Sequence, residues 1–220
     1  LTAFKIMEFV RKGKASKSPE DWAKYAQLLK ENNIAEWYIE SCGKIKYMFP
    51  KGHAVAYVMM AMRIAYFKVH YPVAFYAAYL SRKAEDFDYE IMGNPESAKA
   101  HLDVLTKEPK LDVKKKAEMA ICEIIMEMYA RGVEFLPIDI YKSSGVKFTI
   151  EDGKIRVPLI AIAGLGGAVI DNIISERETG KFISYEDLKR RTKVSQTIIE
   201  KLKSLNAIDS LSETNQISLF

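Results

Sequence analysis

Apolar residues recur at helical spacing along most of the chain, and short polar segments with proline or glycine interrupt them. This pattern predicts helices over about 2–12, 19–32, 35–41, 53–69, 73–81, 86–92, 95–106 and 110–131. Ser18-Pro19 followed by Asp21 has the layout of a capping box at the start of the second helix. The segment 53–69 is apolar on nearly all sides, so we expect it to be mostly buried, with Tyr57, Tyr66 and Phe67 in the core.

The pattern changes after Pro137. Residues 146–157 alternate around Asp152-Gly153, which is a strong signal for a two-residue β-hairpin. Short helices are predicted again at about 158–163, 167–178, 185–192 and 195–205, and a polar segment closes the chain. The predicted fold class is therefore mainly α, with a helical region over 1–135, a small α+β region with one β-hairpin over 136–208, and a flexible tail over 209–220.

Charge is distributed unevenly, although the chain has 33 Lys and Arg residues against 29 Asp and Glu residues. Residues 41–84 contain no acidic residue, and lysine, arginine, histidine and tyrosine are spread through them. A segment without groups that repel phosphate indicates a nucleotide or nucleic acid as the partner. No window has the length and apolar character of a membrane span, and the first residues lack the layout of a signal peptide.

A glycine-rich turn lies between two apolar segments and reads Gly164-Leu165-Gly166-Gly167. It resembles the helix-hairpin-helix motif, in which glycines let the backbone approach a DNA phosphate. The alternative is an ordinary turn between packed helices. A degenerate second copy is predicted at 193–209, with its turn at Asn206. The nearby basic residues are either a solvated face or contacts to the DNA backbone; they are Lys189, Arg190, Arg191 and Lys193.

The longest distinctive segment is FPKGHAVAYVMMAMRIAYFKVHYP, from Phe49 to Pro72. It resembles the fingers region of bacterial replicative DNA polymerases of the C family, most of all the PolC type, and the resemblance extends over essentially the whole chain. It implies that 1–135 is part of the fingers and that 136–208 binds duplex DNA. It also implies that four residues face the incoming triphosphate: Lys44, Lys46, Lys51 and His53.

The last five residues resemble the pentapeptide by which bacterial polymerases bind the sliding clamp. In that comparison Gln216 contacts the rim of a clamp pocket, and Leu219 and Phe220 fill it. The resemblance thus implies these partners: primer–template DNA, deoxynucleoside triphosphates, the sliding clamp, and the rest of the polymerase polypeptide and replisome. It implies a cytoplasmic nucleotidyltransferase, a DNA-directed DNA polymerase engaged in replication.

Catalysis by such a polymerase needs Mg²⁺ held by palm carboxylates, and no matching acidic motif occurs in this chain. We therefore expect this portion alone to be inactive and the Mg²⁺ ligands to lie outside it. Cys42 and Cys122 are predicted to be reduced thiols, or else Cys42 completes a structural Zn²⁺ site with upstream ligands. Two other functions remain open: a stand-alone helix-hairpin-helix accessory module without catalysis, and an assembly fragment whose basic face meets only protein.

Overall fold

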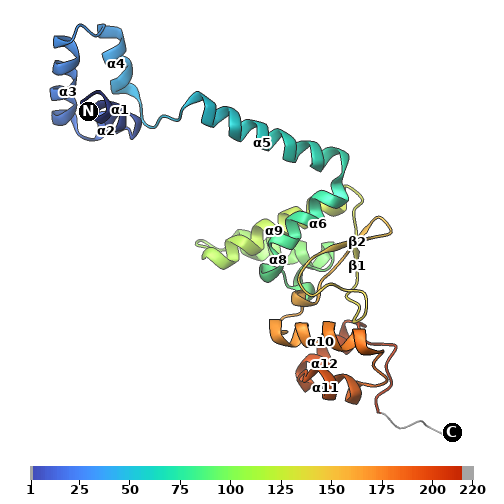
Figure 1. The fold of residues 1–220 in the computed structure, drawn as a ribbon. Helices are drawn as coiled ribbons and strands as arrows, with labels where there is room; N and C mark the ends of the chain where they lie inside the picture. Colours follow the sequence, from blue (N-terminus) through green and yellow to red (C-terminus); the bar gives the residue numbers. More distant parts are fainter. Residues whose placement is uncertain (1, 215–220) are drawn as a thin grey trace. The chain divides into compact units, whose positions relative to one another are not determined.

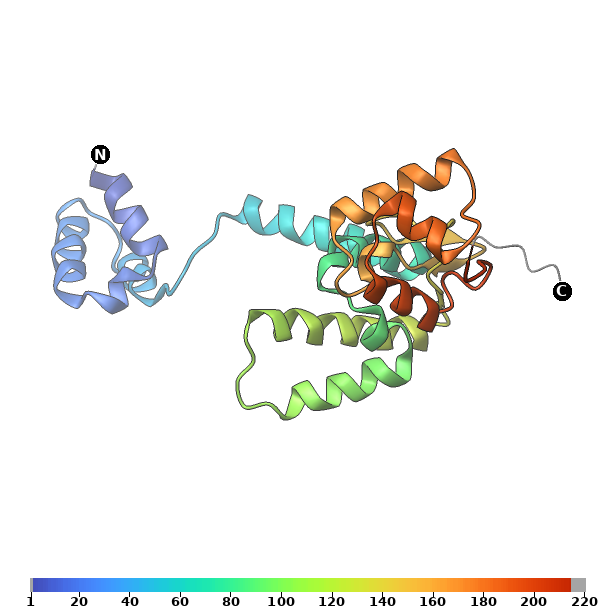
Figure 2. The same cartoon turned by 90° about the horizontal axis from the view of Figure 1, so that it is seen from below.

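The computed structural model describes residues 2–214 and is mainly helical, with one small sheet (Figures 1 and 2). This confirms the predicted fold class. The chain divides into two compact units, 1–63 and 64–220. Among the described residues, no helix has both the length and the apolar character needed to cross a bilayer.

The first unit contains α1 (Thr2–Arg11), α2 (Lys14–Lys17), α3 (Pro19–Glu31), α4 (Glu36–Lys44) and the first part of α5 (Lys51–His70). Ile6, Val10 and Cys42 form its buried centre. Gly13 adopts a left-handed φ of 67°, and a Cβ there would lie 1.8 Å from the Lys46 carbonyl oxygen. The chain after α4 therefore passes against the α1–α2 turn, where only glycine fits.

Helix α5 corrects the prediction of a buried helix, because it has no buried residue. Tyr57 is 68% exposed, Tyr66 54% and Phe67 53%, so these rings are not core residues. The apolar pattern predicted the helix correctly, but it did not predict that the helix would be exposed. An all-round apolar helix needs neighbours on every side to be buried, and the described residues do not supply them.

The second unit begins with the end of α5 and continues with α6 (Pro72–Arg82), η1 (Ala84–Asp86), α7 (Tyr89–Met92), α8 (Pro95–Lys107) and α9 (Val113–Ala130). Helices α8 and α9, green to yellow-green in Figure 2, lie side by side. The Asn94 side chain accepts a hydrogen bond from the Ser97 N–H at 2.9 Å and caps α8. Asp112 caps α9 in the same way through the Lys115 N–H.

The sheet has three short strands in the order β1 (Phe135–Leu136), β3 (Lys154–Arg156) and β2 (Thr149–Glu151). Strands β2 and β3 form the predicted antiparallel hairpin, and Asp152 and Gly153 in its turn have φ values of 52° and 77°. Strand β1 pairs in parallel with β3, which the sequence pattern did not predict.

After the sheet come η2 (Leu159–Ala161), α10 (Gly167–Thr179), α11 (Tyr185–Thr192) and α12 (Gln196–Ser204). The predicted helix over 158–163 is this one turn of 3₁₀ helix. Buried residues from Tyr76 to Leu211 form a single cluster that crosses position 135. The two compact units meet between residues 63 and 64. The boundary predicted near 135 therefore separates two proposed functions, nucleotide binding and duplex binding, within one packed unit.

Two local expectations differ from the structure. Ser18 is the N-cap of α3, but its side chain makes no capping hydrogen bond, so the capping box does not form. The described part of the predicted flexible tail, 209–214, is mostly exposed but is attached to the fold at two residues. Leu211 is buried, and the Ser212 hydroxyl donates to the Ile183 carbonyl at 2.9 Å.

Candidate nucleic-acid interface

The glycine-rich turn lies directly before α10, the helix over Gly167–Thr179. Leu165 points into the core and is 6% exposed, whereas Gly164, Gly166 and Gly167 around it are exposed. The Leu165 N–H donates to the Ile162 carbonyl at 3.0 Å and closes the turn. This buried leucine anchors the hairpin and holds the backbone of the glycines at the surface.

The glycines of this hairpin have two different roles. Gly164 has a φ of 89°, a left-handed conformation that favours glycine. Gly166 has an ordinary φ of −75°, and a Cβ added at Gly166 or Gly167 would meet nothing within 4 Å. The fold therefore explains Gly164 but leaves Gly166 and Gly167 unexplained. Bare backbone at the N-terminus of a helix is suited to a close approach by an anion.

A second hairpin joins α11 to α12 through Lys193, Val194 and Ser195. Lys193 is left-handed with a φ of 59°, Val194 is buried, and Ser195 is the N-cap of α12. The same three roles fall on Gly164, Leu165 and Gly166 in the first hairpin. The predicted second copy therefore corresponds to a hairpin whose connecting turn lies at 193–195. The turn predicted at Asn206 also forms, with a φ of 55°, but it follows α12. The position of the connecting turn was missed because lysine and serine occupy the places that glycines mark in the first hairpin.

The two hairpins contact each other in a reciprocal way. The Lys201 Nζ on α12 donates to the Ala163 carbonyl at 2.9 Å, next to Gly164. The Asn172 Nδ2 on α10 donates to the Thr192 carbonyl, next to Lys193, at 3.4 Å. These contacts fix the two turns relative to each other. Sequence reasoning missed both donors. The only feature of the sequence that could have indicated them is that Asn172 follows Gly164 at the same separation at which Lys201 follows Lys193.

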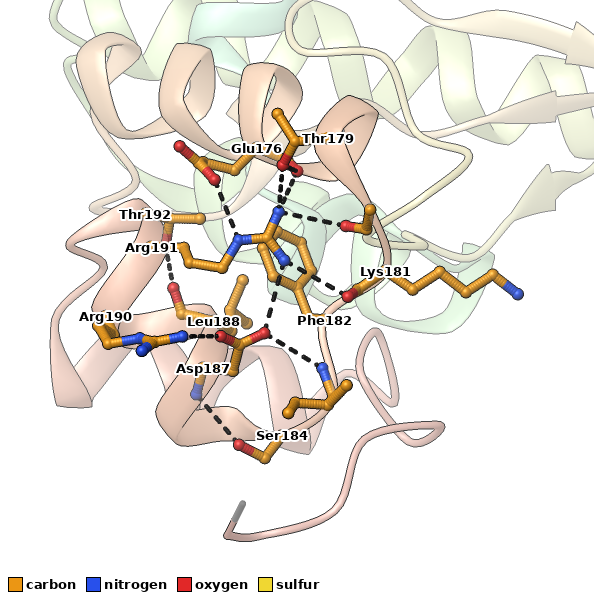
Figure 3. A network of polar contacts seen from close by, with 12 residues as sticks. Glu176, Thr179, Lys181, Phe182, Ser184, Asp187, Leu188, Arg190, Arg191 and Thr192 are labelled. Atoms are coloured by element: carbon orange, nitrogen blue, oxygen red, sulfur yellow. Dashed lines mark hydrogen bonds and ion pairs between the residues drawn. The ribbon is translucent and has the colours of Figure 1, made fainter.

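Arg191 is enclosed by acceptors from the α10 end and the following loop (Figure 3). Its Nε donates to the Glu176 carboxylate at 3.0 Å, and its Nη2 donates to the Thr179 hydroxyl at 2.7 Å and to the Glu176 carbonyl. Its Nη1 donates to the Lys181 carbonyl at 3.4 Å. The guanidinium also lies 4.6 Å from the centre of the Phe182 ring. Arg191 therefore connects α10 to α11, and the predicted DNA contact would have to break these bonds.

The neighbouring basic residues differ from Arg191 in exposure. The Arg190 side chain is 73% exposed and forms an ion pair with Asp187 at 2.7 Å. The exposed Lys189 donates to the Gln196 side chain at 3.2 Å. Neither Lys189 nor the exposed Lys193 has an ion pair among residues 2–214. These three side chains lie at or before the second hairpin. Lys189 and Lys193 offer unpaired charge to an external anion, whereas Arg190 is already paired with Asp187.

Asp187 completes the network around Arg191 (Figure 3). Its burial favours the neutral carboxyl, but hydrogen bonds from Arg190, the Ile183 N–H and Arg191 outweigh this and lower its pKa. The hydrogen bond with Glu176 in turn raises the pKa of Arg191. The ion pairs therefore remain charged at neutral pH and hold α11 against the loop over 180–183.

In the first unit, the residues predicted to face a triphosphate lie close together in sequence and are all exposed: Lys44, Lys46, Lys51 and His53. Lys44 ends α4, and Lys51 begins α5. Ion pairs between described residues involve none of the three lysines. The His53 ring stacks on Phe49, with centroids 4.6 Å apart and planes 10° apart. Their roles toward a nucleotide stay predictions.

The described residues provide no complete set of ligands for either predicted metal ion. Residues 2–214 hold no group of three or more His, Cys, Asp or Glu side chains that fits a metal ion. Cys42 and Cys122 are both free and buried. Burial raises the pKa of the Cys42 thiol, which disfavours the thiolate that zinc requires. The Mg²⁺ ligands outside this chain and the Zn²⁺ site that Cys42 would complete with upstream ligands stay predictions. The predicted clamp residues, Gln216, Leu219 and Phe220, lie outside the described residues.

Comparison with known proteins agrees with this geometry. A family model described as "Helix-hairpin-helix motif" matches residues 132–217, which include both hairpins. The chain is 51% identical over 221 residues to the DNA polymerase III PolC-type of Clostridium perfringens, 49% over 219 to that of Thermotoga maritima, and 46% over 220 to that of Bacillus subtilis. Each alignment covers 99–100% of this chain.

The whole chain matches a segment of PolC-type DNA polymerase III. The chain spans only 15–16% of the length of these PolC-type relatives. The resemblance of the segment Phe49–Pro72 to PolC-type polymerases is thus confirmed by alignments over the full chain.

Proposed function

We propose that this chain is part of a replicative DNA polymerase of the PolC type and that its second unit holds the primer–template duplex through the two hairpins. The observation that carries the proposal is the space around Gly166 and Gly167, where an added Cβ would meet nothing within 4 Å. The fold has room for a side chain at both positions and does not require glycine at either one. A DNA phosphate approaching the start of α10 would explain their absence.

The first hairpin would hold phosphate through its backbone. The first turn of any α-helix has N–H groups without helical partners, and the helix dipole favours an anion there. Gly166 provides no side-chain cap for α10. An oxygen of the DNA backbone would therefore accept from these N–H groups and contact the duplex without regard to its sequence.

The second hairpin would use side chains instead. The Ser195 hydroxyl already caps α12 by accepting from the Ile198 N–H at 3.3 Å. Lys193, Lys189 and Arg190 supply positive charge beside this turn, whereas Arg191 supports the turn from inside. Two linked hairpins, one neutral and one basic, would contact two points of the DNA backbone.

For the first unit, we propose that Lys44, Lys46, Lys51 and His53 contact the triphosphate of the incoming nucleotide. The first turn of α5 contains no acidic residue, so charge and helix dipole act together there. Mg²⁺ would supply the electrostatic activation of the primer hydroxyl in the longer polypeptide. The isolated chain is then expected to be inactive in synthesis, and its last residues to bind the sliding clamp in the cytoplasm.

A stand-alone helix-hairpin-helix module is the alternative function. Such a module needs only the region of residues 132–217. The similarity to PolC-type polymerases continues through 99–100% of the chain, including α5, and favours the polymerase. A purely protein-binding fragment would show no steep dependence on salt, unlike a DNA-binding one.

The test is fluorescence anisotropy of labelled duplex DNA against the whole chain and its Gly166→Ala and Gly167→Ala variants, over a series of salt concentrations. Affinity should fall steeply with salt, with a slope of about −0.9 for each phosphate neutralised. Each alanine should weaken binding while the melting temperature stays within about 2 °C, since neither Cβ meets the protein.

Gly52→Ala is a matched control, because its Cβ also meets nothing within 4 Å and it lies in α5. It should leave duplex affinity unchanged. Duplex binding that is indifferent to Gly166→Ala and Gly167→Ala would identify the first hairpin as a packing turn. The proposed function would then lose its main support.

A further inference from the structure

An apolar groove of about 380 Å³ lies in the second unit, between α6 and the last turns of α5. We refer to it as the α5–α6 groove. The nucleotide and DNA contacts proposed above use none of its residues. Its apolar lining comes from both helices and consists of Ile64, Phe67, Ala74, Phe75, Ala78 and Tyr79.

Helix α6 is apolar on two faces, and the described residues bury only one of them. Tyr76, Ala77 and Leu80 are buried in the core of the second unit. Ala74 and Ala78 lie on the other side of the helix and are exposed. A helix with one buried face usually carries polar residues on the other. The second apolar face of α6 therefore indicates a further element that packs on it.

The walls of the groove are also incompletely covered. Ile64 and Phe67 on α5 are each 53% exposed. The rings of Phe75 and Tyr79 on α6 lie side by side, with centroids 6.3 Å apart and planes 26° apart. Burying large apolar side chains such as these on a partner would release a substantial amount of free energy.

The shape of the groove fits a helix. Ala74 and Ala78 are four residues apart, so they lie one turn above the other on the exposed side of α6. With no bulky side chain at these two positions, another helix could approach α6 closely. An apolar groove between two helices is a common receptor for the apolar face of an amphipathic helix.

The charge at the groove indicates the chemistry of that helix. Among the described residues that line the groove, only Arg82 is charged; it is exposed, and no ion pair within 2–214 involves it. The nearby Lys68 is already paired with Glu127 at 2.6 Å. An apolar face with an Asp or Glu beside it would fill the groove and pair with Arg82. A nucleic acid would need several cations and little apolar surface.

The lengths of the relatives indicate where such a helix would come from. This chain spans only 15–16% of the PolC-type relatives, so most of a polypeptide of that kind lies outside it. A helix of the same polypeptide would dock at a high effective concentration. It would also keep the apolar surface covered, whereas an uncovered one favours aggregation.

We propose that the α5–α6 groove receives an amphipathic helix from the part of the polymerase polypeptide outside this chain. Its apolar residues would lie against Phe67 and Phe75, and an acidic residue would pair with Arg82. The docked helix would hold the last turns of α5 on α6. The inference goes beyond the proposed function, because it concerns neither DNA nor a nucleotide, and it rests on that function only for the longer polypeptide.

The test compares the maleimide reactivity of Ala78→Cys in this chain and in the polymerase polypeptide that contains it. Ala78 is exposed in this chain, so its replacement should react quickly. In the polymerase the reaction should be at least about tenfold slower, because a thiol under a docked helix reacts only when the contact opens. The natural Cys42 and Cys122 are buried, and mass spectrometry of the peptides separates them from the new thiol.

Ala100→Cys is the matched control, since Ala100 is an exposed alanine on α8 outside the groove. Its reactivity should be the same in both proteins. The proposal is overturned if Ala78→Cys reacts equally fast in the chain and in the polymerase, or if Ala100→Cys is slowed as much as Ala78→Cys.

The charge of the docked helix is tested at Arg82. In the polymerase, Arg82→Glu should raise the labelling rate of Ala78→Cys about fivefold or more, because the reversed charge repels the acidic residue of the helix. Arg82→Lys retains the charge and should leave labelling slow. Equal labelling rates in these two variants would contradict an acidic partner.

Photo-crosslinking identifies the segment that fills the groove. Benzoylphenylalanine is introduced in the polymerase in place of Tyr79, where it retains an aromatic ring. The crosslinked peptide should come from the same polypeptide, outside this chain, and should have apolar residues at helical spacing with Asp or Glu beside them. A crosslink to DNA or to a second copy of this chain would overturn the proposal.

Failure of this inference and failure of the proposed function are distinguishable. Duplex binding by the whole chain, and its weakening by Gly166→Ala, do not involve the groove. If the chain binds duplex DNA as proposed but Ala78→Cys reacts equally fast in the chain and in the polymerase, only the docked helix is ruled out.

Discussion

Asn172 and Lys201 donate matching hydrogen bonds across the two hairpins, each to the carbonyl that precedes the left-handed residue of the other turn. Each donor is equally far along the chain from its own left-handed residue, Gly164 or Lys193. The hairpins are thus two copies of one unit, linked by contacts of the same kind. This pairing fixes the distance between the two proposed phosphate contacts.

The two left-handed positions should respond differently to substitution. Gly164→Ala puts a side chain at a φ of 89° and should lower the free energy of unfolding by about 1–2 kcal/mol. Lys193→Gly removes the strain of a φ of 59° but adds backbone entropy to the unfolded chain. It should therefore change the free energy of unfolding by less than about 1 kcal/mol. Urea denaturation measures both. Equal losses would contradict the equivalence of the turns.

Arg191 and Arg190 are a matched pair for testing the network of Figure 3. Arg191→Lys leaves acceptors on α10 and the 180–181 loop unsatisfied and should cost about 2 kcal/mol of stability, since one ammonium cannot replace the planar guanidinium. Arg190→Lys retains a charge on a side chain that is 73% exposed and should change stability by less than about 0.5 kcal/mol. Similar losses in the two variants would mean that Arg191 does not support the hairpin.

Asp187 should make the stability of the chain sensitive to acid. Its folded pKa is below the ordinary value of 3.8, so the ionised carboxylate stabilises the fold above that pH. This stabilisation is lost as the pH falls through the lower folded pKa. Unfolding experiments should therefore find the difference between the parent and Asp187→Asn largest above about pH 5 and smaller toward pH 2. A difference that stays constant over this range would contradict the assignment.

Gly13 should be far less tolerant than Gly52. Gly13→Ala combines a left-handed φ with a Cβ 1.8 Å from the Lys46 carbonyl oxygen, and it should cost at least about 2 kcal/mol. Because Lys46 lies in the segment between α4 and α5, residues 45–50 should become more susceptible to limited proteolysis. Gly52→Ala meets nothing and should be neutral or stabilising. Unchanged proteolysis of Gly13→Ala would show that the segment is held by other contacts.

Local chemistry explains the elements that were predicted correctly. The turn at Asp152-Gly153 and the hairpin at Gly164–Gly167 each depend on a few adjacent residues whose backbone freedom decides the geometry. Such interactions are contained within the segment itself. A single sequence therefore suffices to place them, and the helical pattern suffices for the mainly α fold.

Long-range packing decided the features that were predicted wrongly or missed. Lys193 adopts a left-handed conformation in a turn anchored by the buried Val194 and joined to α10 through Asn172, and no residue type signals this. Most of Arg191's partners are on α10 and its following loop, including main-chain carbonyls, which any residue could supply. The exposure of α5 depends on which neighbours are present and not on its own apolar pattern. Contacts between distant segments produce no recognisable pattern in a single sequence, because each residue of such a contact could pair equally well with many different residues elsewhere in the chain.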